Sequence, residues 1–334
     1  MSQSDFSATD FPNHEEGTIG VGDGHTLYWR SHGNPRAPAV VILHGGPGGA
    51  HNPRLSFFFD PAFWRVVLFD QRGCGQSTPH ASTEHNTVDK LVADMELLRE
   101  ALAIERWALF GGSWGTRLAL AYGVAHPLRC TGFMMRGVFL GRPEDIQWFL
   151  WDAKLLFPDA HADFLSAIEA ACSRRPQSLE ELLRFAAPVL TAGHPQRQAL
   201  ASAWDLYEWR MATVQPMPAI ETEGDAGVKA QGKALSLATL EHHYMANVLP
   251  GEPSMLDLVK QIAHIPCEIV HGRYDIVCPV SQAWQLAKAW PAASLSIAPT
   301  SGHWALATEM AALLQAASAK LAMRIRRQSL HEAI

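Results

Sequence analysis

The sequence predicts an α/β protein in which a mostly parallel central sheet carries helices on both faces and receives a helical insertion. Short runs that are apolar throughout alternate with helical segments over the first 140 residues, and the same alternation returns after about residue 265. Parallel strands covered on both faces have this continuously apolar character. Between the two regions the strand signals vanish. The length of 334 residues exceeds one small domain and predicts either two domains or one large domain with an insertion.

The N-terminal part of the predicted sheet occupies residues 1–141. Apolar runs predict strands at 38–43, 64–69 and 107–110, and glycine-rich or polar turns follow each of them. Apolar residues at helical spacing predict helices at 87–102 and 118–125.

The remaining chain divides into a helical insertion and a return to the sheet. Residues 142–255 are rich in Ala, Leu, Trp and Glu at helical periods, which predicts a helical insertion. Residues 256–334 complete the core, with strands expected at 267–271 and 294–298 and helices at 282–290 and 309–326.

Composition excludes several classes of partner and of protein. Lys and Arg number 27 against 33 for Asp and Glu, a net charge of −6 that disfavours nucleic-acid binding. No apolar run approaches the ~18 residues of a membrane span. The polar, acidic residues 1–10 do not resemble a leader, and the five cysteines are scattered singly. We therefore expect a cytoplasmic protein with reduced thiols.

A serine nucleophile is predicted at the end of the 107–110 strand. Gly111 to Gly115 fits the pattern G-x-S-x-G, which places Ser113 on a sharp strand-to-helix turn. Hydrolases with this arrangement supply the acid and then the histidine later in the chain, each after a strand. Asp275 follows the 267–271 strand and His303 follows the 294–298 strand, so these residues are the predicted acid and base.

The predicted oxyanion site lies in the glycine-rich loop of residues 44–49. The backbone N–H of Gly45 or Gly46 could approach a substrate carbonyl there, with the N–H of Trp114 as the second donor. Neither phosphate-binding glycine motif is present, and no His or Cys cluster has metal-ligand spacing. The sequence therefore predicts an enzyme site that needs neither a cofactor nor a metal ion.

Taken together, these motifs resemble those of the proline iminopeptidase family, whose members are serine aminopeptidases of the α/β-hydrolase fold. The matching stretches are LHGGPGG at 43–49, FDQRGCGQSTPH at 69–80, FGGSWGTRLALAYGVAHP at 110–127, MRGVFLGR at 135–142 and HGRYDIVCP at 271–279. The resemblance implies a cofactor-free enzyme that removes an N-terminal proline from small peptides through an acyl-enzyme, with Ser113, Asp275 and His303 as the triad.

The insertion carries shorter matches to the same family, and the resemblance implies that residues 142–255 form a helical cap domain. AWDLYEW at 203–209 and LEHHY at 240–244 are similar to family segments, which implies that Glu208 and Glu241 hold the free imino group of the substrate. Two carboxylates can recognise one cationic amine and so restrict cleavage to the first residue. Arg136 and Phe139 match positions that line the proline pocket in the family.

Two segments depart from the family pattern, and two other functions remain open. Residues 150–154 read LWDAK, and Trp304 to Thr308 replace the usual serine and acid after the catalytic histidine, so we expect a reshaped substrate pocket. An esterase or amidase acting on other small acyl groups would share every core motif. A non-catalytic ligand receptor on the same fold is the alternative outside enzymes, although it would have no need of the full triad.

Overall fold

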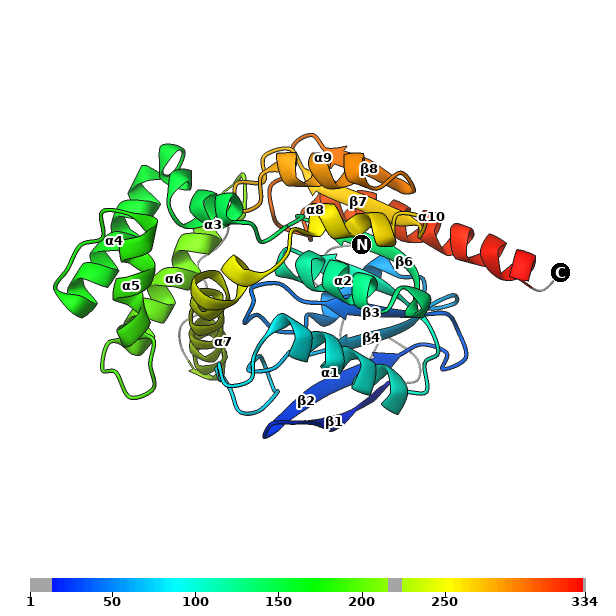
Figure 1. Cartoon of the computed structure of the whole chain (residues 1–334), viewed down its shortest axis with the longest axis horizontal. Helices are drawn as coiled ribbons and strands as arrows, with labels where there is room; N and C mark the ends of the chain where they lie inside the picture. The colour runs from blue at the N-terminus through cyan, green and yellow to red at the C-terminus, as the bar shows by residue number, and fades with distance from the viewer. Residues whose placement is uncertain (1–13, 216–223, 333–334) are drawn as a thin grey trace.

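The computed structural model describes residues 14–215 and 224–332 (Figure 1). Residues 1–10, on which the expectation of no leader rests, lie outside this part of the chain. Within it, no helix is long and apolar enough to cross a membrane. All five cysteines are free thiols.

An eight-stranded sheet forms the centre of the molecule. Its strands are β1 (Glu15–Gly22), β2 (His25–His32), β3 (Ala39–Leu43), β4 (Arg65–Phe69), β5 (Trp107–Gly112), β6 (Cys130–Arg136), β7 (Cys267–Gly272) and β8 (Ala293–Ala298). Their order across the sheet is β1-β2-β4-β3-β5-β6-β7-β8. The pairs β1–β2 and β2–β4 are antiparallel, and every other pair is parallel. The carboxyl ends of the parallel strands therefore meet at one edge of the sheet.

In residues 14–215 and 224–332, ten α-helices accompany this sheet. They are α1 (Val88–Ala101), α2 (Trp114–Ala125), α3 (Pro143–Leu150), α4 (Pro158–Cys172), α5 (Leu179–Val189), α6 (Arg197–Met211), α7 (Gly224–His243), α8 (Met255–Leu258), α9 (Val280–Ala289) and α10 (Thr308–Glu332). Helices α3 to α7 lie together at one end of the sheet, whereas α10 runs away from them toward the C-terminus (Figure 1).

Alternate residues of the central strands enter two separate hydrophobic cores. On β3, Val41 and Leu43 pack in the cluster that includes α1 and α2, whereas Val40 and Ile42 pack in the cluster that includes α10. Successive side chains of a strand point to opposite faces, so one continuously apolar strand supplies both cores. Burial on both sides fixes the register of the strands and hence the positions of the loops at their carboxyl ends.

The predicted α/β class with a mostly parallel sheet is confirmed, and five predicted strands occur within one or two residues of their expected limits. Three strands were not anticipated. The β1–β2 hairpin and β6 lack the continuous apolar run of a buried strand, and the Cys130–Arg136 strand contains a glycine and two methionines. The helix expected from residue 118 begins at Trp114, because the turn at Ser113 leads directly into it.

Candidate active site

Ser113 occupies a strained turn between β5 and α2. Its backbone has φ 55° and ψ −125°, a conformation that L-residues rarely adopt. Two close approaches hold the turn in place. A Cβ on Gly115 would lie 2.1 Å from the Leu43 carbonyl oxygen, and the Ser113 N–H donates to the Arg136 carbonyl at 3.1 Å. The packing of β3, β6 and α2 thus forces the serine out toward the carboxyl edge of the sheet.

His303 and Asp275 are paired beside this serine. The His303 Nδ1 and the Asp275 Oδ2 are 2.7 Å apart, and the Cys278 N–H donates to the other Asp275 oxygen at 2.8 Å. Although burial alone would raise the pKa of Asp275, the charge and hydrogen bond of His303 hold that pKa below its ordinary value. An ionised carboxylate on Nδ1 leaves Nε2 of His303 as the nitrogen that can accept a proton.

Two residues that sequence reasoning did not single out as site residues hold this pair. Gly137 has φ 52°, and a Cβ there would lie 2.8 Å from the His303 ring. His271 is fully buried, accepts a hydrogen bond at Nδ1 from the Val138 N–H at 3.1 Å, and bonds through Nε2 to the Cys278 carbonyl at 2.8 Å. Burial lowers the pKa of His271. This neutral ring ties the loop after β6 to the loop that presents Asp275.

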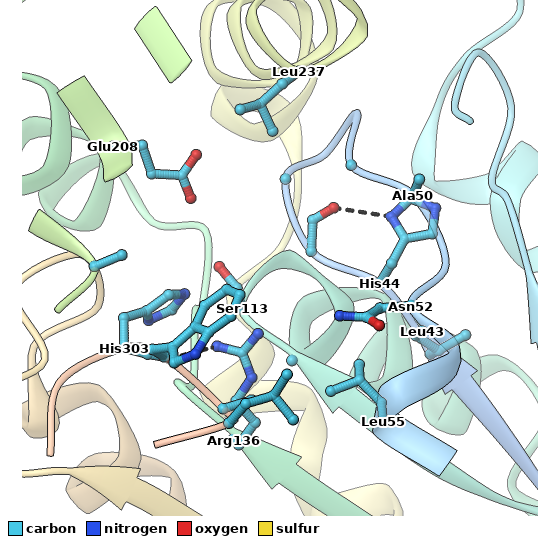
Figure 2. Close-up of a pocket in the computed structure, with 18 of the residues that line it drawn as sticks. Leu43, His44, Ala50, Asn52, Leu55, Ser113, Arg136, Glu208, Leu237 and His303 are labelled. Carbon is cyan, nitrogen blue, oxygen red and sulfur yellow. Dashed lines mark hydrogen bonds between the residues drawn. The ribbon is translucent and has the colours of Figure 1, made fainter. Parts of the chain in front are cut away.

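Ser113 and His303 line one cavity of about 190 Å³, together with residues of the inserted helices. Figure 2 shows the Ser113 hydroxyl and the His303 ring facing the space below Glu208, with His44 and Asn52 on the opposite side. The volume is below the roughly 300–1,000 Å³ of a drug-sized site, so the enclosed part suits a small acyl group.

Of the two candidate oxyanion donors in the glycine-rich loop, Gly45 lies against the nucleophile. A Cβ on Gly45 would lie 3.2 Å from the Ser113 Cβ, whereas one on Gly46 would meet the backbone nitrogens of Gly48 and Gly49. Trp114 begins α2, so its N–H belongs to the unsatisfied first turn of that helix. The geometry favours Gly45 and Trp114 as the donor pair.

Gln71 connects the two segments that carry these candidate donors. Its side-chain amide donates to the His44 carbonyl at 3.0 Å and accepts from the Trp114 indole N–H at 2.9 Å. Its own backbone N–H donates to the His44 ring at 3.0 Å. The residue is 1% exposed, so these hydrogen bonds are shielded from water. The sequence feature that could have identified Gln71 is its place in the DQRG turn that follows β4.

We expect Gln71→Leu to lower kcat by about 10- to 100-fold with little change in KM, because both oxyanion donors lose their support. Steady-state kinetics on a good substrate, with circular dichroism to verify folding, measures this. The exposed Gln315 on α10 gives the control, and Gln315→Leu should match the parent enzyme. A kcat for Gln71→Leu within twofold of the parent value would show that Gln71 does not position the two donors.

The structure also brings together the two glutamates of the insertion. Glu208 on α6 lies on the cavity wall, while Glu241 on α7 is 1% exposed and lies behind it, within hydrogen-bonding reach. The Trp204 indole N–H donates to Glu241 at 2.6 Å. Burial and the neighbouring Glu208 carboxylate raise the pKa of Glu241 well above its ordinary value, and burial raises that of Glu208. Such a pair is stabilised by an incoming cation.

Arg136 lies at the cavity, but Phe139 is placed differently. Arg136 lines the cavity and donates to the His303 carbonyl at 2.9 Å, and its Nε is buried without a hydrogen-bond partner. Burial lowers the pKa of Arg136. Phe139 is 5% exposed within the main hydrophobic core, and the residues that line the cavity do not include it.

No group of three or more His, Cys, Asp or Glu side chains in residues 14–215 and 224–332 could hold a metal ion.

Comparison with known proteins yields a consistent set of relatives. A family model described as the alpha/beta hydrolase fold matches residues 38–309. A proline iminopeptidase of Arabidopsis thaliana is 43% identical over 312 residues, which cover 92% of this chain and 80% of that protein. A proline iminopeptidase of Xylella fastidiosa is 43% identical over 293 residues, covering 86% and 90% of the two chains. The crystal structure of a Mycobacterium smegmatis proline iminopeptidase matches with a TM-score of 0.65 over 94% of this chain and 100% of that one, and its 19% identity makes this a likeness of fold.

Proposed function

The chain belongs to the proline iminopeptidase family of α/β hydrolases, and from that membership we propose that Ser113, His303 and Asp275 release proline from the amino terminus of small peptides. The activity is that of a prolyl aminopeptidase, and its relatives across plants and bacteria carry the same name. The observation that carries the site assignment is the buried Glu208–Glu241 pair beside the cavity of Ser113.

In the proposed reaction the carboxylate pair receives the charged imino group of the first residue. That contact places the following carbonyl carbon at Ser113, whose proton passes to Nε2 of His303 as the hydroxyl oxygen attacks. The N–H groups of Gly45 and Trp114 stabilise the oxyanion. His303 then protonates the leaving nitrogen, and water hydrolyses the prolyl ester to regenerate Ser113.

We further propose that residues 142–255 act as a cap domain on the hydrolase core. Helices α6 and α7 supply Glu208 and Glu241, so the cap closes the cavity at the end where the substrate chain begins. A closed end of this kind favours an exopeptidase, since a preceding residue would have to occupy the space of the glutamates. The five unpaired cysteines favour a reducing compartment such as the cytoplasm for this reaction.

Three anilides test the proposal: prolyl, alanyl and N-acetylprolyl. We expect the prolyl anilide to be cleaved fastest and the acetylated one about 100-fold or more slowly, since acetylation removes the cation that the glutamates bind. Equal rates on the prolyl and acetylated compounds would point to the esterase or amidase alternative. No hydrolysis of any of the three by folded protein would favour the receptor.

A further inference from the structure

Two tryptophans from distant parts of the chain meet at the cavity. Trp209 follows Glu208 on α6, and Trp304 follows His303 after β8. Their ring centroids are 5.6 Å apart with an interplanar angle of 78°, an edge-to-face arrangement. Both side chains are half-buried and both line the cavity of Ser113.

Backbone contacts fix this pair to the cap and to the core at once. The Trp304 N–H donates to the Ala212 carbonyl at the end of α6, at 3.1 Å. A Cβ on Gly302 would lie 3.2 Å from that same carbonyl oxygen, so the two segments are in close contact. Ala212, Ala305 and Leu306 continue the lining beside the two rings. The result is an apolar wall next to the catalytic histidine.

The reaction determines which part of a substrate meets this wall. The amino end is held at Glu208, and the leaving nitrogen must reach Nε2 of His303, because Nδ1 is bonded to Asp275. The residue after the cleaved bond therefore lies on the His303 side of the cavity, where Trp304 and Trp209 stand.

The Arg and Lys side chains of the lining each have a partner. Arg136 donates to the His303 carbonyl, and Lys233 pairs with Asp205 at 3.2 Å. The wall itself offers only aromatic and aliphatic surface. A partner side chain would gain from burying apolar area and from ring-to-ring contact, whereas a carboxylate would gain neither.

We propose that Trp209 and Trp304 form a binding subsite for the side chain of the second residue, which selects aromatic and large aliphatic groups. This subsite rests on the proposed function, because it takes its orientation from Glu208 and His303. Peptides that begin with proline followed by a bulky apolar residue are the substrates it favours.

The test compares kcat/KM for three amides: prolyl-phenylalaninamide, prolyl-glycinamide and prolinamide. We expect the parent enzyme to prefer the phenylalanine compound over the glycine compound by about tenfold. Trp209→Ala should bring that ratio close to one, because kcat/KM falls more for the phenylalanine compound than for prolyl-glycinamide. Trp304→Ala should lower the same ratio, and since a disturbed His303 would slow all three amides equally, the ratio isolates the subsite.

Two control variants accompany these measurements. Trp209→Phe keeps an aromatic face and should retain most of the preference, and Trp284→Ala removes a tryptophan on α9 that is 54% exposed. A parent enzyme that favours prolyl-glycinamide, or a ratio unchanged in Trp209→Ala, would overturn the subsite. Failure to cleave even prolinamide would overturn the proposed function, so the two failures are distinguishable.

Discussion

Ser113→Ala is expected to lower kcat on prolyl substrates by about 10⁴- to 10⁶-fold, because the covalent route depends on the hydroxyl oxygen. Folding should be unaffected. Alanine and serine experience the same strain at φ 55°, and the contacts that hold the turn are made by the backbone. The measurement is single-turnover kinetics together with a thermal melt.

The matched control for this variant is Ser166→Ala, at an exposed position on α4. It should retain full activity. Substantial turnover by Ser113→Ala would remove the serine from the mechanism, whereas loss of both activity and folding would show that the turn needs the hydroxyl for stability.

Glu241→Gln is expected to lower kcat/KM for free-proline substrates by about 100-fold or more, since an amide cannot neutralise the imino group. The hydrolysis of 4-nitrophenyl acetate, which has no amine, should change little. Glutamine can still accept the hydrogen bond from the Trp204 indole, so the local packing is preserved. Glu180→Gln, at an exposed position on α5, is the control. Equal losses on amine and ester substrates would refute recognition of the amine.

The raised pKa of this pair gives the prediction a pH dependence. As pH falls through that pKa, a carboxylate is protonated and the KM for prolyl substrates rises, at pH values where an ordinary glutamate stays ionised. The stability of the fold depends on pH in the opposite direction to substrate binding. A carboxyl whose pKa is raised in the folded state binds more protons there than in the unfolded state, so stability falls as pH rises from about 4.5 through the raised pKa.

Glu241→Gln removes the buried carboxyl whose ionisation lowers the stability of the fold. Its Tm should exceed that of the parent near pH 8, and the difference should shrink toward pH 4. Thermal melts across this range provide the measurement. An unchanged or lower Tm at pH 8 would mean that the two carboxyls do not oppose each other in the folded protein.

The sequence predicted the elements whose signal is local. Strands β3, β4, β5 and β7 are buried along their whole length, and Ser113 and Asp275 follow two of them, whereas His303 follows the less buried edge strand β8. Strand β6 was not anticipated, because its place between β5 and β7 is set by tertiary pairing rather than by its own composition.

The site residues on the inserted helices were harder to predict from the sequence alone. Glu208 and Glu241 resemble surface glutamates of ordinary helices, and only similarity to a family suggested their role. Their mutual contact depends on how α6 packs against α7, for which no periodicity provides a rule. The same holds for Trp209 and Trp304, which are 95 positions apart (304 − 209). Their aromatic contact arises only once the cap rests on the core.

His271 has a further consequence for proton transfer. Both of its ring nitrogens are committed to backbone groups, so it cannot store a proton without breaking the bond from Val138. Two imidazoles lie within 3.4 Å of the Asp275 carboxylate. In the proposed mechanism, His303 rather than His271 therefore carries the proton taken from Ser113, and the bonds of His271 serve to hold the two loops in place.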